Sequence, residues 1–146
     1  MTDVENLLVN PNATIREAMT RIDRGTNGIA LVVDESRCLI GTITDGDVRR
    51  AILAGVNLEE PVEQLLSRKA SPLYAKPITA PVGAERDVLL RLMQEHRVRQ
   101  VPLVDDQGGI AGLAMLDELL PDQVLPLQAV VMAGGMGTRL RPLTDN

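Results

Sequence analysis

The stretch Gly41-Thr42-Ile43-Thr44-Asp45-Gly46-Asp47 combines side chains and a predicted backbone geometry that could hold a nucleotide. It lies where an apolar run ends and a helical pattern begins, so free backbone N–H groups and the positive end of the helix dipole favour an anion. Thr44 can exchange hydrogen bonds with a phosphate or ribose oxygen, and Asp47 can accept hydrogen bonds from two vicinal ribose hydroxyls. Gly41 and Gly46 would let a ligand approach the backbone closely. The plain alternative is that Thr44 and Asp47 only cap the helix.

A second, glycine-rich pattern lies at the carboxyl end, in residues 128–146 (QAVVMAGGMGTRLRPLTDN). Residues 129–133 form a continuous apolar run, which is typical of a buried parallel strand. The glycines that follow would let backbone amides approach a triphosphate, and an arginine would add a bidentate charge. This predicted nucleotide loop comprises Gly134, Gly135, Gly137, Thr138 and Arg139.

The elements that position the first motif can be predicted from the residues around it. Two β-branched apolar runs, residues 28–34 and 38–44, predict a hairpin with a charged turn between them. Upstream, Thr14 can cap a helix together with Glu17 three residues later. Downstream, residues 45–54 carry apolar side chains in helical register, and Gly55 follows as a stop signal.

The same order of elements returns in the second half of the chain. Residues 83–96 show one apolar helical face, residues 100–104 and 110–115 flank a turn, and residues 116–120 predict a short helix. Aligning Gly112 with Gly41 gives an offset of 71 residues. The sequence therefore predicts two copies of one unit that share a core neither could fill alone, with clefts where their sheets meet.

Composition excludes several classes of protein. The 146 residues carry a formal net charge of −5 and Tyr74 is the only aromatic residue, which argues against nucleic-acid binding. One cysteine, Cys38, cannot form an intrachain disulfide, and the single His96 leaves no Cys/His cluster with metal-ligand spacing. With no apolar stretch long enough for a membrane span and no signal-peptide pattern, we expect a soluble cytoplasmic protein with no metal site and no membrane partner.

Over about residues 5–120 the chain resembles tandem cystathionine-β-synthase (CBS) domains, the paired regulatory unit called a Bateman module. The resemblance rests on the element order and on GTITDGD at positions 41–47, which matches the family motif G-x-h-T/S-x-x-D at every position. It implies an α/β (α+β) fold of two repeats, each strand-helix-hairpin-helix, packed as a pseudo-twofold pair. It also implies a site for the ribose, phosphate and base of an adenine nucleotide, formed by Gly41, Thr44, Asp45, Asp47, Ile29, Ala30, Ala13 and Thr14.

The second copy departs from this motif. Counting from Gly112 gives GLAMLDE, so Met115 replaces the hydroxyl and Glu118 takes the carboxylate position. We therefore expect one competent site, at the first motif, and a weak or empty second one. Family members also place a phosphate-contacting basic residue before the strand at 100–104, which carries over to Arg99. Arg50, His96 and Arg97 are interpreted instead as exposed residues on helix faces or near helix ends.

The carboxyl-terminal string GGMGTRLRPLT resembles the signature G-x-G-T-R-L-x-P-L-T that opens sugar-phosphate nucleotidyltransferases. A CBS pair ahead of such a domain is similar to guanylyltransferases that act on glucosamine 1-phosphate or mannose 1-phosphate. In that family later segments supply the metal-binding carboxylates and the sugar pocket, so we expect Mg²⁺ only in the catalytic domain. We expect residues 127–146 to be the truncated start of that domain and the present chain to be non-catalytic.

These resemblances imply a division into repeat 1 at residues 1–57, a linker at 58–74, repeat 2 at 75–121 and the domain start at 127–146. The implied function is regulatory binding of AMP, ADP or ATP, coupled to the chain's own catalytic domain, in a homodimer. S-adenosyl compounds and magnesium stay open as ligands. The alternative function is a scaffold that dimerises the enzyme without any ligand.

Overall fold

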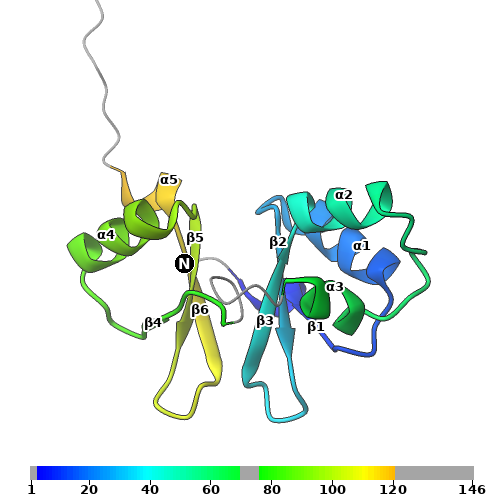
Figure 1. Cartoon of the computed structure of the whole chain (residues 1–146). Coiled ribbons are helices and arrows are strands. Elements are labelled where there is room, and N and C mark those ends of the chain that lie inside the picture. The colour runs from blue at the N-terminus through cyan, green and yellow to red at the C-terminus, as the bar shows by residue number, and fades with distance from the viewer. Residues whose placement is uncertain (1–2, 70–75, 121–146) are drawn as a thin grey trace, which may run out of the picture.

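The computed structural model describes residues 3–69 and 76–120, which form two repeats that lie side by side (Figure 1). Each repeat holds a three-stranded sheet and its own helices. The first repeat contains the 3-10 helix Glu5–Leu7, β1 (Leu8–Val9), α1 (Ile15–Gly25), β2 (Ile29–Val33), β3 (Leu39–Thr44), α2 (Asp45–Leu53) and α3 (Glu63–Arg68). The second contains β4 (Ala80–Pro81), α4 (Arg86–His96), β5 (Gln100–Val104), β6 (Ile110–Met115) and α5 (Leu116–Leu119).

The predicted internal repeat is present in the structure. Helices α1 and α4 and the hairpin strands β2 with β5 and β3 with β6 correspond at the same offset of 71 residues. In both sheets the first strand is parallel to the second, and the second is antiparallel to the third. Even the register shift recurs, between Val32 and Val33 in β2 and between Leu103 and Val104 in β5.

Helix boundaries follow local signals. Thr14 caps α1 in a capping box with Glu17, as predicted. The prediction that the second-repeat helix begins at Gly83 is wrong, because α4 begins at Arg86. Gly83 has a φ of 82° and the N-cap Glu85 is extended, so the chain is not yet helical there.

The shorter length of α5 has a sequence cause. It ends at Leu119, whereas its counterpart α2 continues for nine residues. Leu120 is extended, with a ψ of 136°, and Pro121 follows it in the sequence. A residue that precedes proline is disfavoured in the helical region, so the second repeat presents a single helical turn where the first presents a longer helix.

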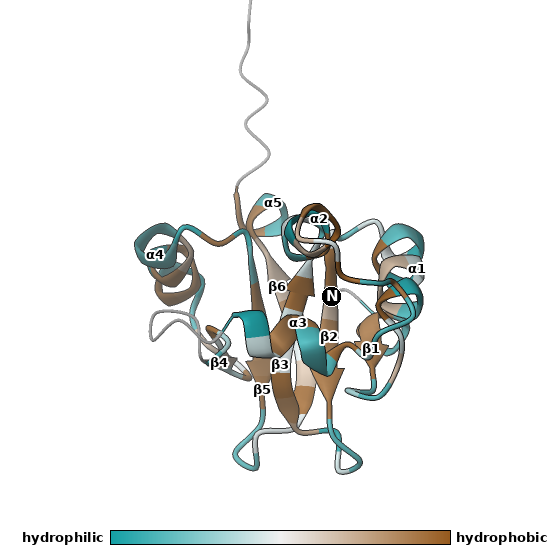
Figure 2. Cartoon of the chain, turned by 45° about the vertical axis from the view of Figure 1, so that its right-hand side comes forward, coloured by the Kyte–Doolittle hydropathy of each residue, from teal (hydrophilic) through white to brown (hydrophobic). Residues whose placement is uncertain are grey.

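Strand β2 is buried along its whole length because each of its two faces is covered by a different layer. Ala30 and Val32 face α1, α2 and α3 in the core of the first repeat, whereas Leu31 and Val33 face the other direction. There they pack in a layer shared by both repeats. This layer contains Val4, Leu7, Ile29, Leu31 and Val33 of the first repeat and Ile110 and Leu113 of β6. Figure 2 shows the apolar residues gathered on these strands and the polar ones on the outward helical surfaces.

The two hairpins are also joined at their turns. Leu39 donates its backbone N–H to the carbonyl of Gly108 at 3.1 Å, and Ile110 donates to the carbonyl of Arg37 at 3.1 Å. The repeats are therefore held together both by the shared apolar layer and by backbone hydrogen bonds. Across the residues described, no helix has the length and apolar character that crossing a membrane requires.

We predict that Leu31→Ala lowers the free energy of unfolding by about 2–5 kcal/mol, because it removes a fully buried side chain from the layer that both repeats share. The whole loss should appear in a single urea transition followed by circular dichroism. Leu53→Ala is the control, since this side chain is 81% exposed and its truncation should change stability by less than about 0.5 kcal/mol. Two separate transitions, with only one of them shifted, would contradict the shared layer.

Candidate functional site

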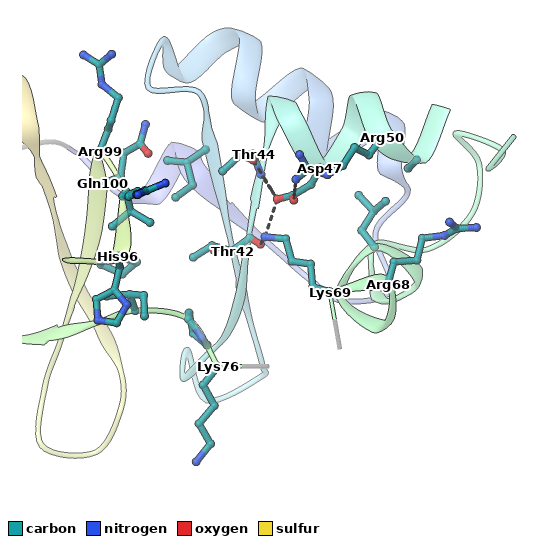
Figure 3. A pocket seen from close by; sticks show the side chains of 18 residues that line it. Thr42, Thr44, Asp47, Arg50, Arg68, Lys69, Lys76, His96, Arg99 and Gln100 are labelled. Atoms are coloured by element: carbon teal, nitrogen blue, oxygen red, sulfur yellow. Dashed lines mark hydrogen bonds and ion pairs between the residues drawn. The ribbon is translucent and has the colours of Figure 1, made fainter. Parts of the chain in front are cut away.

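A cleft of about 820 Å³ lies between the two repeats. One wall comes from β3, α2 and α3 of the first repeat, and the other comes from the end of α4 and the start of β5 of the second (Figure 3). Apolar side chains contribute to the lining, among them Ile29, Ile78 and Val98. The cleft thus combines apolar surface with charged groups, as small-molecule sites do.

The central acidic group of the cleft is the carboxylate of Asp47, in the first turn of α2. Its side chain is only 8% exposed. Oxygen Oδ2 accepts hydrogen bonds from the Thr44 backbone N–H at 2.8 Å and from the Thr44 hydroxyl at 3.0 Å. Lys69 lies 2.6 Å from the same oxygen, and Arg50 donates to Oδ1 at 2.6 Å. Asp47 therefore both forms the capping box with the N-cap Thr44 and anchors a charged network.

The protonation of Asp47 reflects this network. Burial raises the pKa of the carboxyl, but the hydrogen bonds from Lys69, Thr44 and Arg50 and the charge of Lys69 outweigh burial. The pKa of Asp47 consequently lies below its ordinary value of 3.8. At neutral pH the cleft therefore presents an ionised carboxylate, which can accept hydrogen bonds but cannot donate them.

Lys69 stands at the carboxyl end of α3 and reaches across to α2 and β3. Its ammonium group donates to the backbone carbonyl of Thr42 at 2.5 Å as well as pairing with Asp47. Its side chain is 24% exposed, whereas that of Arg50 is 73% exposed. The Lys69 pair is thus the more sheltered of the two ion pairs on Asp47. Figure 3 draws the contacts of Asp47 as dashed lines.

The cleft is cationic although the whole chain is acidic. Among the residues that the structure describes as lining it, Asp47 is the only carboxylate. Against it stand six cations and a histidine: Arg50, Arg68, Lys69, Lys76, Arg97, Arg99 and His96. Low-dielectric walls focus such a field, so the cleft attracts anions from solution.

Four of the nine residues predicted for the first site line this cleft: Ile29, Thr44, Asp47 and Arg99. They come from both repeats. Arg99 belongs to the wall opposite Asp47, and in Figure 3 its side chain points away from that carboxylate. Its guanidinium pairs instead with exposed Asp117 of α5, at 2.9 Å.

The other five predicted residues, Gly41, Asp45, Ala30, Ala13 and Thr14, are not among the described residues that line the cleft. Gly41 is packed by Leu66 of α3, whose Cδ2 would lie 2.6 Å from a Cβ at position 41, so its lack of a side chain serves packing. Ala30 is fully buried in the core of the first repeat.

The remaining three predicted residues have structural partners or lie at the surface. Thr14 accepts a hydrogen bond from the Glu17 backbone in the α1 cap, and Ala13 accepts one from Val62. Asp45 is exposed at the start of α2. The nucleotide loop predicted at the carboxyl end, Gly134, Gly135, Gly137, Thr138 and Arg139, lies outside the described residues.

Sequence reasoning missed most of the basic lining. Arg50, His96 and Arg97 are exposed, as predicted, yet they also line the cleft. Lys69 and Lys76 were not singled out, because they belong to the connection between the repeats and to no motif. Only the packing of one repeat against the other brings the end of α4 opposite α2.

The pH dependence of stability follows from the lowered pKa of Asp47. Because this carboxyl binds its proton more weakly in the folded chain than in the unfolded chain, the unfolded chain takes up more protons as pH falls. The stabilisation from Asp47 is therefore present in full above about pH 4 and is lost as pH falls further.

We predict that Asp47→Asn is less stable than wild type by about 1–2 kcal/mol at pH 7, and that this gap narrows towards pH 2. Urea unfolding at several pH values measures it. Asp45→Asn, which removes an exposed carboxylate from the same helical turn, controls for the helix dipole. A gap between wild type and Asp47→Asn that stays constant with pH would show that the charge of Asp47 does not contribute.

Comparisons with known proteins bear on both repeats. The CBS domain family matches residues 1–54 and 70–121. A protein of Helicobacter pylori is 30% identical over 113 residues, which are 77% of this chain and 32% of that protein. An inosine-5'-monophosphate dehydrogenase of Aquifex aeolicus is 25% identical over 123 residues, 84% of this chain and 24% of that enzyme. The chain thus spans less than a third of the length of these curated relatives.

The fold has a counterpart among solved structures. A CBS domain protein from Pyrobaculum aerophilum, complexed with AMP, matches with a TM-score of 0.69 at 21% identity, over 80% of this chain and 85% of that one. This likeness concerns the fold, and the family match covers both repeats of the sequence. The chain therefore belongs to the CBS domain family, with two CBS domains in tandem.

Proposed function

We propose that this CBS pair binds an adenine nucleotide, AMP, ADP or ATP, in the cleft between its repeats and that occupancy regulates an attached catalytic domain. The observation that carries the proposal is the buried, ionised carboxylate of Asp47 in a cleft whose other charged lining residues, among those described, are cations. A carboxylate of this kind can accept hydrogen bonds from the two vicinal hydroxyls of a ribose, and the cations can neutralise the charge of a phosphate.

The cleft offers suitable groups for the base, the sugar and the phosphate of a nucleotide. Ile29, Ile78 and Val98 offer apolar contact for a base, Thr44 and Asp47 offer polar groups for the sugar, and the basic side chains attract phosphate. The CBS protein of like fold that was solved with AMP supports this assignment. The choice of adenine as the base rests on the resemblance to the CBS family and not on a side chain of the cleft.

We further propose one nucleotide per chain, because the second repeat departs from the first at both polar positions of the motif. Met115 stands where the first repeat has Thr44, and it offers no hydroxyl. Glu118 stands where the first repeat has Asp47, in a helix of only four residues. A helix this short sums fewer peptide dipoles, so its N-terminus attracts an anion less strongly.

The regulated domain is proposed from the sequence alone. The string GGMGTRLRPLT within residues 127–146 supports a nucleotidyltransferase that joins a nucleotide to a sugar phosphate, with Mg²⁺ bound in that domain. In this proposal residues 1–57 and 75–121 are the two CBS repeats and 58–74 link them. Coupling requires that the nucleotide bind the active and inactive states of the enzyme with different affinities.

A scaffold that holds two enzyme subunits together is the second candidate. It is favoured by large apolar side chains left exposed on helices, notably Leu53 at 81% and Ile52 at 47% on α2 and Val88 at 44% on α4. Such side chains are typical of protein interfaces when they are contiguous. Homodimerisation through these exposed side chains is compatible with nucleotide binding. The molecular mass of the protein in solution shows whether a dimer forms.

We predict that AMP binds the 146-residue chain with a stoichiometry of one, measured by isothermal titration calorimetry because the chain has no tryptophan. Asp47→Ala should weaken binding at least about 100-fold, since a ligand that gave two hydrogen bonds to a charged group would lose both. Glu118→Gln, the matched change in the second repeat, should leave AMP affinity within about twofold of wild type.

Three outcomes separate the candidates. Loss of binding in Asp47→Ala alone supports the sensor at the first motif. Equal binding by wild type and Asp47→Ala would contradict the assigned site. Absence of heat with AMP, ADP and ATP, together with a dimer by light scattering, would replace the sensor with the scaffold.

We also predict that this chain releases no pyrophosphate from a nucleoside triphosphate and a sugar 1-phosphate in the presence of Mg²⁺. The reason is that the family draws its metal-binding carboxylates and its sugar pocket from segments beyond the glycine-rich loop. An enzyme-coupled pyrophosphate assay measures this. Turnover that disappears in Arg139→Ala would show instead that residues 127–146 complete a catalytic site.

A further inference from the structure

We infer that Lys69 is the specificity-determining residue of the cleft: its ammonium occupies the Asp47 carboxylate until an anionic ligand draws it away, so the site selects phosphorylated ligands over bare nucleosides. The inference rests on the proposed function and adds to it a rule about which ligands are accepted. It is carried by the contacts of Lys69 with Asp47 and Thr42.

Asp47 can accept only a limited number of hydrogen bonds. A carboxylate offers about four lone-pair sites for hydrogen bonds. In this structure Oδ2 already faces the Thr44 backbone N–H, the Thr44 hydroxyl and Lys69, and Oδ1 accepts from Arg50. Oxygen Oδ2 is therefore crowded and Oδ1 has one acceptor position left, so a ribose diol, which needs two acceptors, can bind only if at least one present donor leaves.

Lys69 is the donor that a phosphorylated ligand would displace. The Thr44 backbone N–H is fixed at the start of α2, whereas Lys69 reaches the carboxylate from α3 on a flexible four-carbon stem. Arg50 belongs to the same helix as Asp47, contacts the other oxygen and is largely exposed. Lys69 thus occupies Asp47 Oδ2, the oxygen that also accepts from the Thr44 hydroxyl. Its side chain can change rotamer and leave this oxygen without any helix unfolding.

The displaced ammonium of Lys69 needs a new anionic partner. When Lys69 leaves Asp47, a partly buried cation loses its ion pair, and that loss is unfavourable unless another anion replaces the carboxylate. A phosphate on the same ligand can take that role. Adenosine brings no such group, and the sulfonium of S-adenosylmethionine adds positive charge to a cleft with six cations against one carboxylate.

The charge of the surrounding lining reinforces this rule. Arg68 lies next to Lys69 in the sequence and lines the same cleft. In Figure 3 the Arg68 side chain points away from the Lys69 ammonium, so Arg68 adds to the positive field of the cleft that attracts a phosphate and does not share the contact of Lys69 with Asp47. Arg68 has no ion pair with Asp47 among the described residues, which makes it the matched control for Lys69.

The test measures the affinities of adenosine and AMP for the 146-residue chain and its variants by calorimetry. In Lys69→Met adenosine should bind about tenfold more tightly, because its competitor for Asp47 is gone, while AMP should bind more weakly or unchanged. In Arg68→Met AMP should weaken and adenosine should not change. The ratio of the two affinities should therefore fall for both variants, but only Lys69→Met should raise adenosine binding.

A second variant guards against misfolding of the first. Lys69→Gln keeps a donor for the Thr42 carbonyl and removes the charge, and its adenosine affinity should fall between wild type and Lys69→Met. If Lys69→Met or Lys69→Gln weakens AMP without strengthening adenosine, Lys69 is an ordinary phosphate contact and the inference is overturned while the proposed function stands. If wild type and all variants bind neither ligand, the proposed function falls and the inference with it.

Discussion

The structure depends on one constraint: each small sheet has an apolar face that is buried where the two repeats pack together. Strand β2 is buried on both faces, with Ala30 and Val32 under the helices and Leu31 and Val33 against the second repeat. A single repeat would expose that second set of side chains to water. Burying them is favourable by about 25 cal/mol per Å² of apolar surface, so the two repeats form one cooperative body.

The same packing creates the cleft. When the sheets meet face to face, the start of α2 in one repeat comes to lie across from the end of α4 in the other. The Asp47 carboxylate then lies in a space whose opposite wall carries His96, Arg97 and Arg99. A site of mixed charge thus arises between two units that each have an ordinary helix cap and an ordinary helix end.

Asp47 combines two roles that compete for the same atoms. As a cap it accepts from the Thr44 backbone and stabilises the first turn of α2. As a ligand group it would have to offer free acceptors, which Lys69 and Arg50 now occupy. The Asp47 carboxylate therefore stabilises the fold through the same atoms that the proposed ligand needs. A ligand that binds there must replace the ion pairs that Asp47 gives up. The second repeat differs from the first at this place, with Met115 at the position of Thr44 and a four-residue α5 at the position of the longer α2.

Much of the fold was determined by local sequence. The capping pair Thr14 and Glu17, the apolar runs of the hairpins and the offset of 71 residues predicted the elements and their repetition, because each signal acts over a few neighbouring residues. The start of α4 was predicted three residues early, since Gly83 and the extended Glu85 interrupt a pattern that is apolar but not yet helical.

Only the tertiary structure decided which residues share the cleft. The motif predicted Thr44 and Asp47 together, but not that Gly41 would be covered by Leu66 or that Lys69 would pair with Asp47. These contacts join segments that are separated in sequence, and no spacing rule encodes them. They follow from how α3 crosses β3 and how one repeat packs on the other, which depends on the combined shape of many side chains.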